Sequence, residues 1–471
     1  MKLLPLRLAK KPPASPQRLT NTLPAELLVE IASHLTWAMD VLNFSLTSSK
    51  LRTILLPEMY RTVFLFGGAW SGALEMFARR PDLCGYIRRL EIDLIYEAIR
   101  PGHWQEEADI DEIAMLLEKA SAGLLNLHTF TWCGRRLPPD PLLRTLRTSY
   151  GLSATQEFAL FDESHCPFDP ESELFKFDDL TGFTLWVSHD EKANDQPAQM
   201  QDVPVQLGDM LLQRCPNLDS LSIRLRSSPT IWTYEPQIDR LLSGFWPKLR
   251  YCHFDIEIFD SNPLVFWPPL GTFKRFLSVH SSITELVLIP YSISPTTFSR
   301  ELPKCLEPEI SWQLTYFEGL IQHVAELPNP AALKILILST VVTEASLASL
   351  IPVLRNLISL RELTIEFDDI DPSVAMRDIV GVCPNLTNLL LKFYKTAFSP
   401  KQLSDLSSHL KPLLQLRSLH LDKEYSASHG TLLKTALMFL ADMPLLDDIC
   451  ILNFRDDHWT EIYEGKRNGV G

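Results

Sequence analysis

Three short stretches of the sequence decide the fold: residues 360–367 read LRELTIEF, residues 386–393 read LTNLLLKF, and residues 416–423 read LRSLHLDK. Each stretch has an apolar residue at its first, fourth and sixth positions, with polar residues mostly in between. Side chains point alternately to the two faces of a β-strand, so this pattern predicts a strand that buries one face.

The same pattern occurs at eleven places along the chain, and the last five begin 27, 26, 30 and 30 residues apart. This spacing is close to the roughly 20–29 residues of leucine-rich repeats. Earlier gaps of 31 to 53 residues indicate insertions. The predicted strand cores are residues 87–92, 127–132, 180–185, 218–223, 249–254, 283–288, 333–338, 360–365, 386–391, 416–421 and 446–451.

Helical patterns lie between these strands. They cover residues 110–120, 205–214, 312–327, 344–356, 401–414 and 432–443. Strands that alternate with helices imply parallel strands joined by right-handed crossovers. Stacked units of this kind form a solenoid in which each repeat buries its apolar positions against its neighbours. The sequence therefore predicts an α/β fold, with an irregular solenoid over residues 66–460.

The flanking and inserted segments have distinct compositions. Residues 1–19 are basic and rich in proline, which favours a disordered lead-in over a mitochondrial presequence. Insertions are expected near 156–204 and 290–310, and residues 461–471 are expected to fray. Twelve acids lie between residues 156 and 202. We interpret them as a solvated loop, with attraction of a basic target as the other possibility.

Composition excludes several classes of protein. Of the 471 residues, 46% are hydrophobic and 22% charged, as in a packed protein, and no apolar run approaches the roughly 20 residues of a membrane-spanning helix. The net charge of −14 argues against nucleic acid as a partner. The eight cysteines are widely scattered, which favours reduced thiols in the cytoplasm or nucleus.

Residues 20–65 carry a separate helical pattern. Leu27, Ile31 and Leu35 form one apolar stripe, Asp40 is expected to cap a second helix, and Ser48 or Ser49 is expected to open a third that Pro57 closes. Three helices in so short a segment make a very small core. We therefore expect this helical module to pack against another surface for its stability.

This module resembles an F-box. The resemblance rests on the opening Leu23-Pro24-x-Glu26-Leu27-Leu28-x-Glu30-Ile31, and residues 45–63 most resemble fungal members. The tryptophan common in the third F-box helix is absent. Two sequence segments are similar to repeats of F-box proteins with leucine-rich repeats. They are Cys215-Pro216-Asn217-Leu218 and Cys383-Pro384-Asn385-Leu386.

The resemblance implies a substrate receptor of a Skp–cullin–F-box ubiquitin ligase. The F-box would dock on the Skp adaptor, the cullin scaffold would join the complex, and the repeats would hold a target protein. The residues that the family pattern assigns to adaptor docking are Leu23, Pro24, Glu26, Leu27, Ile31, Leu35 and Leu42. Internal packing is the other interpretation of these positions. The alternative function is an interaction scaffold in which the helices merely cap the solenoid.

Enzymatic chemistry is not expected. The sequence has no nucleophile elbow, phosphate-binding loop or HExxH zinc motif, and Cys252 occupies a buried slot of a repeat. We predict no catalytic residue, no metal and no cofactor. The concave strand face is the expected surface for a target, and its candidate residues are mixed in sign. They are Arg224, Tyr251, His253, Asp255, Glu362, Glu366, Lys392, His420 and Asp422.

Overall fold

The computed structural model divides into two compact units, residues 1–133 with 138–154 and residues 134–137 with 155–471. It describes residues 23–35, 38–66, 70–94, 110–121, 123–134, 137–150, 155–161, 169–188, 205–226, 238–257, 270–291, 313–325, 327, 329–368, 370–393, 398–424, 432–455 and 458–466. The lead-in of residues 1–19 and most of the segment 290–310 lie outside these ranges.

The first unit begins with three helices, α2 (Ala25–Ser33), α3 (Ala38–Leu46) and α4 (Ser49–Met59). Their small core consists of Leu28, Ala32, Leu51 and Leu55, all at most 1% exposed. The predicted third-helix cap is confirmed, because the Ser48 side chain accepts a hydrogen bond from the amide of Leu51 (3.1 Å).

Two details of the helical prediction are wrong. Pro57 lies inside α4 instead of closing it, and the amide of Tyr60 still donates to Leu56 O at 3.2 Å. Proline removes one helical donor, and in this last turn that loss does not stop the helix. Asp40 lies within the first turn of α3, where it faces the positive end of the helix dipole but is not the capping residue.

The rest of the first unit alternates strands with helices. Its strands β1 (Thr62–Phe66), β2 (Arg89–Asp93) and β3 (Thr129–Gly134) are parallel, with Val63, Leu90 and Phe130 side by side. Strand β1 corrects the expected extent of the helical module, because Val63 and Leu65 alternate into the core. The helices are α5 (Trp70–Arg79), α6 (Pro81–Cys84), α7 (Ile110–Ser121) and α8 (Asp140–Tyr150).

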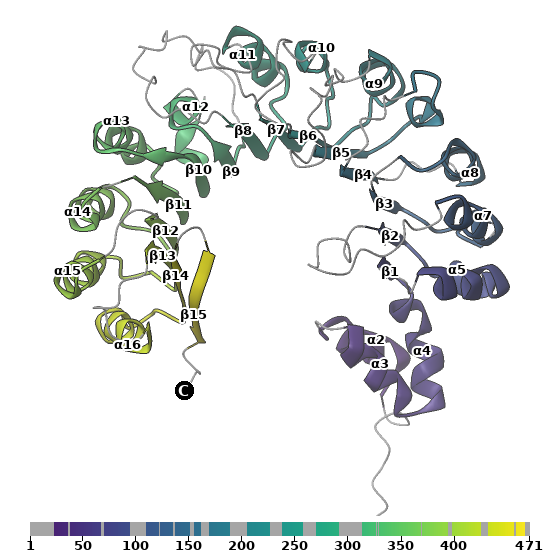
Figure 1. The fold of residues 1–471 in the computed structure, drawn as a ribbon, viewed down its shortest axis with the longest axis horizontal. Coiled ribbons are helices and arrows are strands. Elements are labelled where there is room, and N and C mark those ends of the chain that lie inside the picture. Colours follow the sequence, from purple (N-terminus) through teal and green to yellow (C-terminus); the bar gives the residue numbers. More distant parts are fainter. Residues whose placement is uncertain are drawn as a thin grey trace, which may run out of the picture. The chain divides into compact units, whose positions relative to one another are not determined.

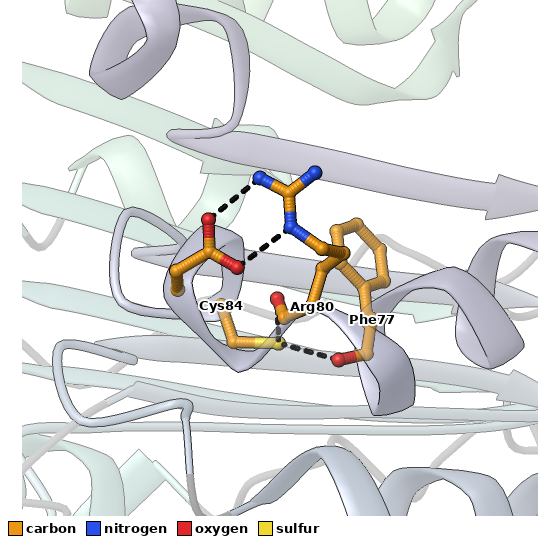
Figure 2. A network of polar contacts seen from close by, with 4 residues as sticks. Phe77, Arg80 and Cys84 are labelled. Carbon is orange, nitrogen blue, oxygen red and sulfur yellow. Dashed lines mark hydrogen bonds and ion pairs between the residues drawn. The ribbon is translucent and has the colours of Figure 1, made fainter.

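The corner between α5 and α6 shows how a cysteine of this chain is used (Figure 2). The Cys84 thiol is fully buried and donates to the carbonyls of Phe77 (3.4 Å) and Arg80 (3.8 Å). On the surface, the Arg80 guanidinium binds Asp82 through two hydrogen bonds of 2.8 and 2.6 Å. Cys84 therefore acts as a small core residue.

The second unit continues the parallel pattern through ten strands in chain order, from β5 to β14, with β4 beside β5. The strands are β4 (Thr155–Phe161), β5 (Gly182–Ser188), β6 (Ser220–Arg226), β7 (Tyr251–Glu257), β8 (Glu285–Tyr291), β9 (Tyr316–Gly319), β10 (Ile335–Val342), β11 (Glu362–Phe367), β12 (Asn388–Phe393), β13 (Ser418–Glu424) and β14 (Asp448–Arg455).

Short helices cover the outer side of these strands. In Figure 1, α13–α16 lie outside and β10–β14 lie inside the bend of this unit. The helices of this unit are α9 (Val205–Asp209), α10 (Ile238–Leu242), α11 (Leu270–Val279), α12 (Ile321–Ala325), α13 (Glu344–Arg355), α14 (Pro372–Val382), α15 (Pro400–Leu410) and α16 (Leu432–Asp442). A π-helical turn, Met210–Arg214, follows α9, and a 3₁₀ turn, Glu173–Lys176, precedes β5.

One apolar row runs through the core of the second unit from strand to strand. Adjacent strands are registered so that the central apolar residue of each repeat lies beside that of the next, and every member is at most 2% exposed. The row consists of Leu221, Cys252, Leu286, Phe317, Leu336, Leu363, Leu389, Leu419 and Ile449. All eleven predicted strand cores lie at strands, which confirms the repeat interpretation.

The fold is thus of the α/β class, with three amino-terminal helices followed in sequence by a leucine-rich-repeat solenoid of parallel strands and outer helices. No helix within the described ranges is long and apolar enough to cross a membrane.

Three expectations about the second unit are wrong. The range 312–327 is not one helix, since β9 precedes the short α12. The range 156–204 is not one insertion, because it contains the unexpected β4 in addition to β5, which the repeat pattern predicted, while residues 189–204 lie outside the described ranges. Glu173, expected in a solvated loop, is 5% exposed and paired with Lys176 at 3.4 Å.

The carboxyl end also differs from the prediction of a frayed tail. Residues 458–466 form β15 (His458–Lys466), which pairs antiparallel with β14, and Ile451 lies opposite Tyr463. The last parallel strand would otherwise present a row of unpaired amides and carbonyls, and the antiparallel partner satisfies that edge.

Candidate partner-binding surfaces

The three-helix segment exposes large apolar side chains. The exposed fractions are 50% for Leu27, 42% for Ile31, 63% for Met39 and 55% for Leu46. Leu27 and Ile31 are four residues apart on α2, and the neighbouring positions Leu28 and Ala32 make the internal core instead. Single exposed apolar residues are ordinary, but four within three short helices, two on α2 and two on α3, are candidates for contact with a partner. We call these four residues the apolar helical face.

The residues predicted for adaptor docking fall into two groups. Leu27 and Ile31 belong to the apolar helical face, and Pro24 and Glu26 are exposed beside the start of α2. Leu23 packs against the internal core, and Leu35 and Leu42 are half-buried. The predicted stripe holds for Leu27 and Ile31, whose side chains are exposed, but it is wrong for Leu35, because α2 ends at Ser33 and Leu35 lies beyond the helix. Met39 and Leu46 were not among the predicted docking residues, since α3 carries apolar residues at several positions and its sequence alone does not show which of them are exposed.

A second surface is the face of the strands that the helices leave uncovered, on the inner side of the bend of the second unit (Figure 1). We call the strand positions on this face outward, because their side chains point away from the buried row. On β6 and β7, the Arg224 guanidinium and the Tyr251 hydroxyl each lie 3.1 Å from Nδ1 of His253. A guanidinium can only donate, so Nδ1 of this imidazole is the acceptor. The Arg224 guanidinium also lies 5.5 Å from the ring centroid of Trp186 on β5, as in a cation–π pair.

Asp255 lies beside Arg224 in the register of β6 and β7 and is 1% exposed. The structure therefore brings Arg224, Tyr251, His253 and Asp255 together, although the sequence offered them only as separate outward positions.

The other predicted target residues lie on β11, β12 and β13. Glu366, Lys392 and Asp422 are side by side in the strand register, and Nε2 of His420 lies 2.7 Å from Oδ1 of Asp422. Burial raises the pKa of Glu366, nearby Asp422 and Asp368 raise it further, and Lys392 opposes the shift. Glu362 lies on β11, four residues before Glu366 on the same outward face, and is half-buried.

The register adds residues that the sequence reasoning missed. Glu285 and Asp448 are outward on β8 and β14, and Tyr316 and Glu318 are outward on β9, the strand mistaken for a helix. With them, carboxylates outnumber cations among the charged outward residues of β7–β14, although Lys392 lies beside Glu366 and Asp422 and the face keeps the expected mixture of signs. Counting alternate residues from each predicted apolar core would have found Glu285.

Four buried cysteines of the described residues, Cys84, Cys215, Cys252 and Cys383, belong to the packing. Burial raises the pKa of Cys84 and Cys215 to about 11 and that of Cys383 to about 12, so these thiols are poor nucleophiles at neutral pH. The predicted core role of Cys252 is confirmed by its complete burial. Within the described ranges, no group of three or more metal-ligating side chains is arranged to hold an ion.

Comparisons with known proteins find similarity in fold only. No protein-family model and no curated protein matches the sequence. A leucine-rich-repeat-containing protein of Legionella pneumophila, LegL7, is 11% identical with a TM-score of 0.26, over 85% of this chain and 92% of that one. A chain from the yeast complex of Rad7 and Elc1 is 11% identical with a TM-score of 0.37, over 92% of this chain and 89% of that one. Both likenesses are weak, and the fold assignment rests on the strand register described above.

Proposed function

We propose that this protein is an F-box substrate receptor of a Skp–cullin–F-box ubiquitin ligase, as its motif at residues 23–31 suggests. The helical segment would dock on the Skp adaptor, and the strand face of the second unit would hold a target protein. Such a receptor acts by raising the effective concentration of the target near the ligase and performs no chemistry itself. It would work in the cytoplasm or the nucleus.

The apolar helical face is the observation that carries this proposal. Full burial of a leucine or isoleucine side chain contributes about 1.5–3 kcal/mol, so covering the exposed half of Leu27 and Ile31 would contribute roughly 1 kcal/mol each. Contacts of that size at the centre of an interface are sufficient to make these two residues important for affinity.

The test is co-purification of the full chain with a Skp-family adaptor. The double variant Leu27→Asp/Ile31→Asp should abolish adaptor binding, because both carboxylates would be buried unpaired in the interface. Leu433→Asp is the matched control, since Leu433 is also 50% exposed but lies on α16. No adaptor with the wild-type chain, or equal loss with both variants, would overturn the proposal.

The scaffold alternative has one supporting contact. Tyr60, directly after α4, packs edge-on against Phe77 of α5, with ring centroids 6.1 Å apart. The helices are therefore joined to the first repeat as well as exposed. In this alternative, removal of residues 1–59 causes aggregation while no ligase partner is lost.

A further inference from the structure

Four side chains on β7, β8 and β9 form a compact cluster on the outward strand face. Tyr251, Glu285 and Tyr316 are direct neighbours in the register of the three strands, and Glu318 follows Tyr316 on the same face. Glu285 is exposed, and the other three are half-buried. We call Tyr251, Glu285, Tyr316 and Glu318 the tyrosine–glutamate cluster.

Both tyrosine rings are held in place. The Tyr316 hydroxyl donates to Oε2 of Glu318 at 2.9 Å, and the Tyr251 hydroxyl is bound to His253. Burial raises the pKa of both phenols, and Glu318, Tyr251 and Glu285 raise that of Tyr316 further. The two rings are therefore neutral at physiological pH, and their faces can attract a cation.

The adjacent strands already contain one example of this interaction. Arg224 lies over Trp186, and its Nε has no hydrogen-bond partner within the described ranges. Beside it on the same outward face, Ser222 is 2% exposed and its hydroxyl likewise lacks a hydrogen-bond partner in the described part of the chain. Both atoms are buried and belong to the packing beneath this face, so the less buried side chains of the tyrosine–glutamate cluster are the ones that a peptide can reach.

The strand spacing leaves room for a flat cation between the backbones of the two tyrosines. Neighbouring strands lie about 4.8 Å apart, so the backbones of Tyr251 and Tyr316, separated by the strand of Glu285, are about 10 Å apart. A planar guanidinium stacked between two rings needs roughly 7 Å, about twice the normal separation of packed carbon atoms. Its N–H groups can at the same time donate in pairs to a carboxylate.

We propose that the tyrosine–glutamate cluster binds an arginine side chain from an extended segment of the target protein. This inference deepens the proposed function, because it states the chemistry of the target that the receptor holds. The arginine would stack between Tyr251 and Tyr316 and donate to Glu285 and Glu318. Farther along the same strand face, the carboxylates Glu362 and Glu366 on β11 and Asp422 on β13 favour further cations in the same segment and disfavour a polyanion.

The probe for the test is a dye-labelled peptide with three arginines separated by glycine and serine, titrated into the full chain. Matched peptides replace each arginine by lysine or by citrulline, which has almost the shape of arginine but no charge. We expect affinity for the citrulline peptide to be at least about tenfold weaker and that for the lysine peptide to be intermediate, because ammonium is less suited to bidentate bonding. Equal binding of the arginine and citrulline peptides would overturn the proposal.

Single substitutions distinguish specific binding at the tyrosine–glutamate cluster from general attraction of the cationic peptide to acidic residues. Glu285→Gln should weaken arginine-peptide binding about three- to tenfold, and Tyr316→Leu by a similar factor through loss of the ring face. Glu362→Gln is the matched control, because it removes the same charge from the same strand face on β11. If Glu362→Gln weakens binding as much as Glu285→Gln, the attraction is non-specific and the proposal fails. Circular dichroism of each variant checks that the fold is retained.

The outcome is independent of adaptor docking. Leu27→Asp/Ile31→Asp should bind the arginine peptide as the wild type does, since these residues lie on α2. Loss of peptide binding in Glu285→Gln with intact adaptor binding is the expected pattern. If the chain binds the adaptor but shows no selectivity for arginine, the arginine site is wrong and the ligase role stands. If the chain selects arginine but binds no adaptor, the ligase role is wrong and the arginine site stands.

Discussion

A buried histidine makes the stability of the second unit depend on pH. His323 lies in α12 with 4% of its surface exposed, and burial lowers its pKa to about 4 from an ordinary value near 6.5. The unfolded chain therefore binds a proton between pH 6.5 and 4 that the folded chain does not. Stability is fully present above pH 6.5 and falls as the pH decreases toward 4.

The size of this effect follows from the two pKa values. At pH 5 the unfolded state is favoured by a factor of about 30 relative to pH 8, which corresponds to about 2 kcal/mol. The substitution His323→Leu removes the titrating group. We therefore expect the free energy of unfolding of the wild type to fall by about 2 kcal/mol more than that of the variant between pH 8 and pH 5.

The assay is urea unfolding of the full chain at both pH values, followed by tryptophan fluorescence. Only the difference between wild type and variant is compared, so the titration of carboxylates common to both cancels. Leu414→Ala is the control, since it removes an exposed side chain that binds no proton and should keep the wild-type pH dependence. Parallel pH dependences of the wild type and His323→Leu would refute the reasoning.

Three further outcomes are expected from the packing. Phe393 is fully buried between two other rings, with centroid distances of 4.7 Å to Phe367 and 5.0 Å to Phe398. Phe393→Ala should therefore lower the free energy of unfolding by about 3–5 kcal/mol in the same urea assay. Leu414→Ala is the control, because its side chain is 72% exposed and its loss should change stability by less than about 0.5 kcal/mol. Ser48→Ala removes the cap of α4 and should lower the melting temperature through a loss of about 1 kcal/mol, while an unchanged melting temperature would show that the cap is dispensable. Complete burial raises the pKa of the Cys252 thiol, so this residue should resist iodoacetamide at pH 8 until urea unfolds the second unit. Mass spectrometry follows the labelling, and rapid labelling of the folded chain would contradict the place of Cys252 in the core.

The buried row of the solenoid could be predicted because burial imposes a repeated constraint on the sequence. Leu363, Leu389 and Leu419 occupy the same slot in successive strands, and any polar residue there would be buried without a partner. The periodicity was therefore visible in the sequence, and it located eleven of the fifteen strands in the described ranges, missing β1, β4, β9 and β15. The cap of α4 at Ser48 followed from equally local chemistry, whereas the cap expected at Asp40 did not, because α3 begins two residues earlier.

The missed strands lack that repeated signal. Strand β9 has only four residues and buries just Phe317 and Gly319, which is too few alternations to distinguish a strand from a helix turn. Gly319 also approaches Leu288 O so closely that a Cβ would lie 2.8 Å from it. Strand β15 reverses the direction of pairing, so no repeat pattern predicts it, and its role is to cover the edge left by β14.

The outward residues explain why the candidate site was only partly predictable. Their side chains do not determine the fold, so periodicity identifies the positions without ranking them. Register supplies the missing information: Tyr251, Glu285 and Tyr316 are about 30 residues apart in sequence but adjacent in space. The same independence from the core makes binding variants interpretable. Substitutions at exposed positions such as Glu285 usually alter stability by less than about 0.5 kcal/mol, so a severalfold loss of affinity there reports on the binding surface and not on the solenoid beneath it.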